Sequence, residues 1–161
     1  MPTNEQRSYK KALFGTDTDE ERAEYVAAFD VVLDMLSFMH EEGILLLPGT
    51  DLGGSFAYHR ELELFEKIGL SPAEVLRRAS YDMAVYLDQD EDLGSIKKGK
   101  YADFFLVPGD PTQDLSQLRK IQMVASDGVL YFPDQIYPQF GIKPFAAAPT
   151  LIRSTASQVS D

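Results

Sequence analysis

The sequence contains no cysteine, only two histidines and few basic residues. Without cysteine the chain has no disulfides, no zinc-thiolate site and no cysteine nucleophile. Its 15 basic side chains are outnumbered by 26 acidic ones, which gives a formal net charge of −11. This balance argues against nucleic-acid binding and against adhesion to an anionic membrane, because both require a basic surface.

Long apolar runs are missing as well. The run of residues 44–47 has the length of a strand, and no run approaches the roughly 20 apolar residues of a membrane-spanning helix. The first seven residues lack the apolar run of a signal peptide, so no segment assigns the chain to a compartment. The 161 residues are 44% hydrophobic, which excludes wholesale disorder and is enough for a domain with a core.

Capping signals and helical periodicity predict three helices in the first half of the chain. Thr18 and Glu21 form a capping box ahead of apolar residues that recur at helical spacing, which predicts an amphipathic helix over 19–42. A second helix is expected over about 57–68. A third starts at a Ser-Pro-Ala-Glu capping box and spans about 71–87.

Strand signals come from one continuous apolar run and from several short segments in the second half. The run 44–47 lacks alternation, which predicts a strand that is buried on both faces, as in a parallel sheet. Further strands are expected at 95–96 and 102–107. Two more, at 121–125 and 129–132, flank a Ser-Asp-Gly sequence that predicts a hairpin turn.

An acidic run at 88–92 marks the expected boundary between two parts that differ in predicted secondary structure. The predicted organisation is an α/β part over 1–88 and a β part over 93–145. A small, polar tail over 146–161 is expected to be flexible.

Four groups of residues together span about 100 positions in a specific order. They are Leu47-Pro48-Gly49-Thr50-Asp51 with Gly53-Gly54; His59-Arg60-Glu61-Leu62-Glu63-Leu64 with 68–76; Leu93-Gly94-Ser95-Ile96 with Gly99-Lys100, Ala102-Asp103 and Gly109-Asp110-Pro111; and Asp127-Gly128 with Tyr137 and 141–145. In this order the chain resembles the C-terminal end of the metal-dependent amidohydrolase superfamily. The nearest likeness is to its imidazolonepropionase-like and Xaa-Pro dipeptidase-like members.

The resemblance implies an α/β fold, a TIM-type (β/α)8 barrel flanked by a small β-sandwich. A complete barrel takes about 250 residues. The chain would therefore supply only the last βα units and the C-terminal sandwich strands, leaving the barrel incomplete and an N-terminal part missing. Segment 44–47 would be the eighth strand, and Asp51 would lie on the loop at its carboxyl end, where barrel enzymes place their chemistry.

In that family the equivalent of Asp51 binds a divalent metal, with zinc as the expected ion, and accepts a proton from the metal-bound water. The alternative is that Asp51 is a helix cap or turn residue. His59 would lie near the rim of the site, where it contacts substrate or serves in capping or packing. Glu61 and Glu63 are either a catalytic pair or charges of a solvated helix surface.

The histidine count limits the activity that we expect of this chain. The family's metal centre uses four histidines, two of them in a His-x-His pair, whereas this sequence has two in all and no such pair. A catalytic zinc keeps three protein ligands and a water. We therefore expect no metal on the chain alone and no hydrolysis by it.

Three functions remain open at this point. The leading one is the C-terminal part of a hydrolase that acts on C–N bonds of small amides, cyclic amides or dipeptides. The second is a non-catalytic assembly or interaction module that keeps part of the amidohydrolase scaffold, and the third is an unrelated small α/β binding domain. Because 44–47 would expose unpaired strand edges, we expect either self-association or pairing with a missing N-terminal part.

Overall fold

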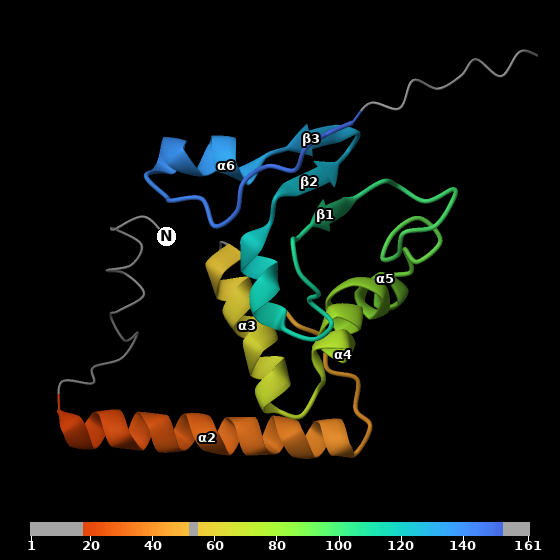
Figure 1. The fold of residues 1–161 in the computed structure, drawn as a ribbon. Helices are drawn as coiled ribbons and strands as arrows, with labels where there is room; N and C mark the ends of the chain where they lie inside the picture. Colours follow the sequence, from red (N-terminus) through yellow and green to blue (C-terminus); the bar gives the residue numbers. More distant parts are fainter. Residues whose placement is uncertain (1–17, 52–54, 153–161) are drawn as a thin grey trace, which may run out of the picture.

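The computed structural model describes residues 18–51 and 55–152, in which the longer helices form the lower layer, and a small sheet with a short helix beside it forms the upper one (Figure 1). The elements, in chain order, are α2 (Asp19–Glu41), α3 (Ser55–Lys67), α4 (Pro72–Arg77), the π-helical turn η1 (Arg78–Asp82), α5 (Met83–Tyr86), β1 (Phe104–Leu106), the 3₁₀ helix η2 (Leu115–Lys120), β2 (Met123–Ser126), β3 (Val129–Tyr131), α6 (Pro133–Ile136) and the 3₁₀ helix η3 (Tyr137–Phe140). None of these helices is both long and apolar enough to cross a membrane.

Helix α2 begins where its capping signal predicts. The backbone N–H of Glu21 donates to Thr18 Oγ1 at 3.1 Å, and the N–H of Thr18 donates to a carboxylate oxygen of Glu21 at 3.0 Å. The two bonds satisfy two of the N–H groups that a helix start leaves without intrahelical partners. The helix lies across the foot of α3 (Figure 1), and Ser37 Oγ donates to the carbonyl of Ile68 at 3.1 Å.

The buried core lies between α3, α4 and η2. Val75 on α4 is fully buried at its centre. The other buried members come from α3, from the turn after it and from η2: Leu62, Phe65, Ile68, Leu70, Leu115 and Leu118. From α2 only Leu33 and Leu36 pack against this cluster, so α2 is attached to the core by a narrow part of its surface.

The third predicted helix starts at its Ser71 capping box but is not uniform. Ser71 N donates to a carboxylate oxygen of Glu74 at 2.8 Å, as the sequence indicates. The helical backbone then widens into the π-turn η1 before it continues as α5. A Cβ added at Gly94 would lie 3.1 Å from both Ser80 O and Tyr81 Cα, so the wider turn lies where the loop that contains Gly94 comes close to the helix.

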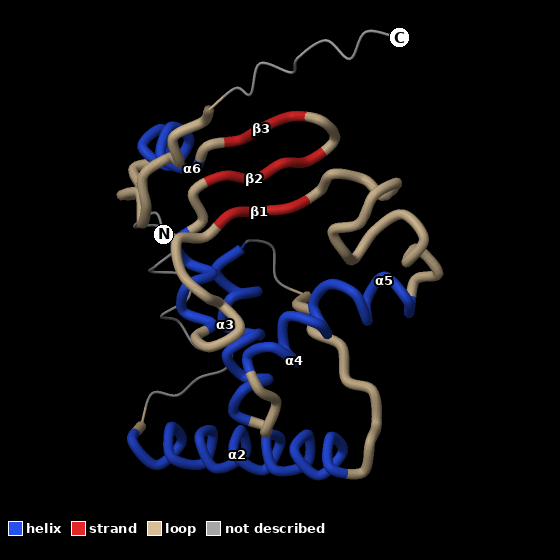
Figure 2. Tube along the Cα trace, turned by 45° about the vertical axis from the view of Figure 1, so that its right-hand side comes forward, coloured by secondary structure: helices blue, strands red, loops and turns tan. Residues whose placement is uncertain are grey.

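The three strands form one antiparallel sheet in the order β1-β2-β3 (Figure 2). Phe105 pairs with Val124, and Ala125 pairs with Leu130. Between β2 and β3 the turn residues Asp127 and Gly128 have φ of 50° and 74°. Two positive φ values in a row are typical of the tight turn that matches the twist of a hairpin, and the predicted hairpin is confirmed.

The predicted strand 44–47 is not a strand in the structure. Its backbone is without regular structure, and among the described residues no backbone hydrogen bond joins 45–47 to another segment. Ile44 and Leu45 are 46% and 49% exposed, so the run is not buried on both faces. The physical reason is that a strand exists only through a hydrogen-bonded neighbour, and no described segment lies in that position.

The second half also departs from the prediction in part. Residues 95–96 form no strand, and Ile96 is 85% exposed. One sheet is present among the described residues, while the second layer of a sandwich stays a prediction. In the tail that was expected to be flexible, residues 146–152 have no regular structure, but Ala148 N donates to Asp134 Oδ2 of α6 at 2.8 Å. The rest of the tail lies outside the described residues, as do residues 1–17 of the predicted first part.

Candidate functional site

Asp51 lies on the surface, at the end of the extended segment that follows α2. The segment is anchored by Pro48, which is fully buried, and the chain then emerges so that the Asp51 side chain is exposed in a bend. The three residues that follow it lie outside the described part. The segment before Asp51 pairs with no strand among the described residues.

His59 lies on α3 and is half-buried. Burial is the main cause that lowers the pKa of His59 below 6.5. The nearby positive charge of Arg119 lowers this pKa further, whereas the carboxylate of Glu63 raises it. The imidazole is therefore held toward its neutral form by the packing of α3 against η2.

Glu63 joins two elements that are distant in the sequence. One of its carboxylate oxygens pairs with Arg119 of η2, which is 56 residues away, and the other accepts from Arg60 Nη1 at 3.2 Å. Both oxygens are thus engaged in ion pairs. This arrangement favours a role in holding α3 to η2 over a role in a catalytic pair with Glu61.

Glu61 has a different environment from Glu63. It lines a cavity between α2 and α3. Burial is the larger cause that raises the pKa of Tyr58, and the charge of Glu61 raises this pKa further.

Arg60 and Glu63 stand three residues apart on one helix face, so their pairing can be recognised in the sequence. Nothing local indicated the participation of Arg119.

The described residues do not bring the two candidate site residues into one cluster. Asp51 is not among the charges that shift the pKa of His59. Within the same residues no group of three or more His, Asp or Glu side chains could hold a metal ion. A catalytic zinc needs three protein ligands, so the residues present here do not by themselves fit the metal centre that the resemblance implies.

The described part of the chain contains cavities away from both candidate site residues. One of about 450 Å³ lies between α5 and β1, lined by apolar side chains such as Met83, Leu87 and Phe104, and beside it Ser95 Oγ is buried without a described partner. Another, of about 360 Å³, lies between α2, residues 45–47 and α3. Neither is lined by Asp51 or His59.

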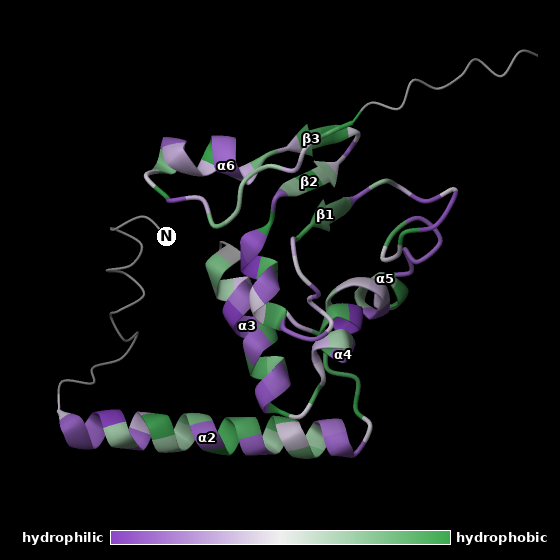
Figure 3. Ribbon diagram, viewed as in Figure 1, coloured by the Kyte–Doolittle hydropathy of each residue, from purple (hydrophilic) through white to green (hydrophobic). Residues whose placement is uncertain are grey.

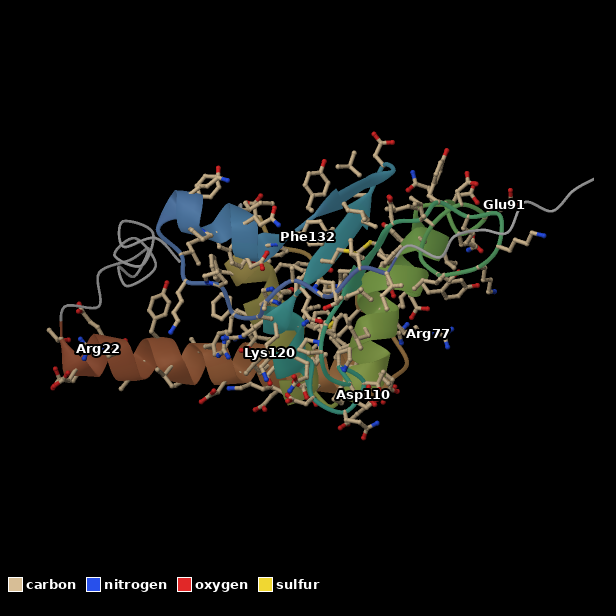
Figure 4. The ribbon with its side chains drawn as sticks, turned by 45° about the horizontal axis from the view of Figure 1, so that its top comes forward. Arg22, Arg77, Glu91, Asp110, Lys120 and Phe132 are labelled. Carbon is tan, nitrogen blue, oxygen red and sulfur yellow. The ribbon has the colours of Figure 1, made fainter. Side chains whose placement is uncertain are left out.

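Arg77 and Glu91 lie at the outer surface, as Figure 4 shows. The pair of salt bridges from Arg77 and Arg78 to Asp82, at 3.0 and 2.8 Å, stays within the helical segment around η1. Lys100 donates to the carbonyls of Asp90 and Leu93, the latter at 3.0 Å, and so closes the acidic loop. These contacts are structural and assemble no reactive group.

The sequence matches the amidohydrolase family over residues 24–131. Among solved structures, an Xaa-Pro dipeptidase with methionine bound in its active site is 26% identical, with a TM-score of 0.62 over 79% of this chain and 31% of that one. An amidohydrolase is 28% identical, with a TM-score of 0.60 over 79% of this chain and 31% of the other. A Bifidobacterium longum protein provisionally classed as a prolidase is 32% identical, with a TM-score of 0.62 over 74% and 32%.

No curated protein matches the sequence. The chain spans about a third of the length of the solved structures that it resembles. Because the family match extends over more than half of the residues and includes most of α2, all of α3 and the sheet, it does not depend on a single motif. The chain belongs to the amidohydrolase family.

Proposed function

We propose that this chain is the C-terminal portion of a metal-dependent hydrolase that cleaves C–N bonds in small amides, cyclic amides or dipeptides. The observation that carries the proposal is the likeness to the Xaa-Pro dipeptidase over 79% of this chain but only 31% of that enzyme. The family match supports hydrolase chemistry, and the prolidase-type structure supports the dipeptide substrate class.

Asp51 is the residue that we propose this chain contributes to the metal centre of the complete enzyme. Its exposure at the end of the extended segment leaves the carboxylate accessible to ligands from elsewhere. We place no catalytic step on this chain alone, since one carboxylate does not make a catalytic metal site. Zinc is the expected ion, as the family resemblance implies.

For His59 we propose a packing role, not contact with substrate. The half-buried imidazole, held toward its neutral form beside Arg119, suits a place in the contact between α3 and η2. Glu63, with both oxygens in ion pairs, belongs to the same contact.

A chimera tests the proposed function without requiring two separate chains to assemble. Residues 24–131 replace the matched region of the Bifidobacterium longum protein, and hydrolysis of an Xaa-Pro dipeptide is measured with zinc and after chelation. We expect metal-dependent hydrolysis. Since even residues that only support a ligand cost about 10- to 100-fold, Asp51→Asn should lower kcat/KM by about 100-fold or more.

Asp88→Asn is the matched control for this chimera. Asp88 is exposed, and its φ of 56° is a conformation that asparagine also adopts, so the variant should keep the activity. A chimera that unfolds cooperatively yet hydrolyses nothing, or one that is indifferent to Asp51→Asn, would refute the proposal.

The second candidate function is a non-catalytic assembly module. It is favoured by one observation, the large apolar surface of α2 combined with the lack of a metal-ligand cluster in the described residues. A folded but inactive chimera would support this module. An active one would exclude it.

A further inference from the structure

Helix α2 carries apolar side chains on the side that faces away from the core. Leu33 and Leu36 pack against the core, and the helical repeat of about 3.6 residues places Val31 and Phe38 on the opposite side. Met35 follows Val31 by one turn, so these three residues form one stripe, which we call the outer stripe of α2. They are 66%, 60% and 54% exposed, and Figure 3 shows apolar positions among hydrophilic ones along this helix. The solvated side of a helix is normally polar, so an exposed apolar stripe indicates an interaction surface.

The outer stripe is separate from the cavity between α2 and α3. The residues of α2 that line this cavity are Phe29, Val32, Leu33 and Leu36, and none of them belongs to the stripe. A partner on the outer stripe therefore leaves both the cavity and the core contact of α2 unchanged.

Carboxylates border the outer stripe. Asp34 lies one turn from both Val31 and Phe38, and Glu24 lies two turns before Val31 on the same side. Both carboxylates are exposed, and neither forms an ion pair with another described residue. Helix α2 as a whole has seven acidic residues and one arginine. An apolar stripe with this border is complementary to a partner that is both apolar and basic.

The chain has a segment of this kind directly before the helix. Residues 7–14, Arg-Ser-Tyr-Lys-Lys-Ala-Leu-Phe, contain three basic side chains and no acidic one, although the whole chain has a net charge of −11. Tyr9, Leu13 and Phe14 are its large apolar residues. The segment lies outside the described residues, and it precedes the family match, which begins at residue 24. The family match therefore assigns it no place in a barrel.

The length of the connection allows this segment to reach the outer stripe. Residue 17 adjoins Thr18, the N-cap of α2. Met35 lies about 26 Å along the helix from Thr18, at a rise of about 1.5 Å per residue. Residues 7–17 span up to about 36 Å when extended. A chain that folds back along α2 thus brings residues 7–14 alongside the stripe while 15–17 form the connection.

Charge argues against two other occupants. In a symmetric contact with a second copy, the acidic border of the stripe would face itself, at a cost in binding free energy. An anionic membrane would be repelled by the same carboxylates. A basic segment of the same chain meets no such repulsion, and its attachment gives it a high effective concentration at the helix.

We propose that residues 7–14 fold back on α2 and cover its outer stripe. The apolar side chains of the segment contact Val31 and Met35, while Lys10 and Lys11 pair with Asp34 and other carboxylates of α2. The inference goes beyond the proposed function and does not depend on it, because it requires neither a metal nor another chain.

The experiment measures the proximity of the segment to Met35 in the full chain. Because the sequence has no cysteine, a nitroxide attached to Ser8→Cys labels a single site. The five methionines give five methyl NMR signals, which are assigned by replacing them one at a time with leucine. The nitroxide should broaden the Met35 signal until ascorbate reduces the label. Met123, which lies on β2 in the upper layer (Figure 1), should keep its intensity.

A charge reversal in the segment supplies the baseline for an undocked chain. Lys10→Glu combined with Lys11→Glu should remove most of the broadening at Met35, because the reversed charges are repelled by the acidic border of the stripe. Lys10→Arg combined with Lys11→Arg is the matched control. It keeps both positive charges, and the broadening should persist.

A second pair of variants tests the helix side of the contact. Asp34→Lys should lower the docked population about two- to fivefold, because it replaces one exposed ion pair by a like-charge contact. Glu91→Lys makes the same change of charge at an exposed site away from α2 (Figure 4) and should leave the broadening unchanged. Thermal unfolding of each variant confirms that it folds.

Four results would overturn the proposal. They are a Met35 signal that the nitroxide leaves unchanged, equal broadening of Met35 and Met123, equal effects of Asp34→Lys and Glu91→Lys, and broadening that arises only between chains. The last is measured by mixing nitroxide-labelled chains with unlabelled chains whose methyl signals are observed. It would assign the outer stripe to the segment of a second copy.

Discussion

At the scale of single residues, the sequence spacing on α3 predicts contacts within the helix but not contacts with distant segments. The pair of Arg60 and Glu63 follows from their separation of three positions on one helix. The partner that gives Glu63 its structural meaning, Arg119, lies 56 residues away and becomes its neighbour only when η2 packs on α3. A prediction for His59 therefore needed the tertiary structure, because both burial and Arg119 lower its pKa.

The balance of charges around His59 can be measured directly. Glu63→Gln removes the negative charge that raises the pKa of His59, so this pKa should fall further. Arg119→Gln removes the positive charge that lowers it, so the pKa should rise toward 6.5. Because the sequence has only two histidines, NMR titration of the imidazole protons distinguishes them once His40→Gln assigns one signal. Shifts in the opposite directions would contradict this arrangement.

The same imidazole makes the folded state sensitive to mild acid. Its folded pKa lies below its unfolded value, so between the two values the unfolded chain binds more protons. The stability contribution is complete above about pH 6.5 and is lost as the pH falls through the folded pKa. Urea unfolding from pH 8 to 5 should show this loss, and His59→Gln should flatten the profile.

A second loss of stability is expected at lower pH from three carboxyl groups. Hydrogen bonds from Ser71 lower the pKa of Glu74, and those from Thr112 and Ser116 lower the pKa of Asp110 and Asp114. Their contribution is present above about pH 4.5 and is lost as the pH falls through the lowered values. The denaturation midpoint of His59→Gln should still fall in this range, which separates the two phases.

At the scale of elements, the local sequence was sufficient to predict an element wherever that element makes its own hydrogen bonds. Both capping boxes and the hairpin turn were predicted because their donors and acceptors lie within a few residues. The prediction of a strand at 44–47 was wrong for the converse reason, because the hydrogen bonds of a strand must come from another segment. The π-turn η1 carries no local sequence signal and coincides with the close approach of Gly94.

That approach predicts a large cost for one glycine substitution. At Gly94, φ is +77° and an added Cβ would lie 2.6 Å from Ala84 Cβ and 3.1 Å from Ser80 O. Backbone strain of about 1–2 kcal/mol and overpacking of about 1–3 kcal/mol should act together. Gly94→Ala should therefore lower the free energy of unfolding by about 2–5 kcal/mol, measured by urea denaturation.

Gly99→Ala separates the two contributions. Gly99 also has a positive φ, +97°, but nothing lies within 4 Å of an added Cβ. Only the backbone strain remains, so the cost should be about 1–2 kcal/mol. Equal costs at the two positions would show that the contact between η1 and Gly94 is not tight in solution.

At the scale of the whole molecule, family membership and the shortage of histidine ligands were accessible from the sequence, whereas the positions of the candidate site residues relative to one another were not. The ordered motifs from Leu47 to Gly128 lie within the family match over 24–131, whereas Tyr137 and 141–145 lie beyond it. Each motif, however, indicates family membership for its own segment only, whereas a metal centre requires side chains from several elements to converge. The described residues contain one core, one sheet and a helix, α2, with many exposed apolar side chains, but no convergent set of ligands.

The last prediction follows from that contrast and concerns zinc. A ligand that binds only the folded state stabilises it by RT ln(1 + [L]/Kd), so a catalytic-type site would raise Tm strongly at micromolar zinc. Because Asp51 is exposed and the described residues hold no metal-ligand cluster, we expect no Tm shift beyond about 1 °C, no saturable heat in calorimetry and no zinc-dependent hydrolysis of Xaa-Pro dipeptides. The complete Bifidobacterium longum protein serves as the positive control. Stoichiometric zinc binding by this chain that Asp51→Ala abolishes would contradict the expectation, and it would mean that the chain assembles a metal centre without a partner.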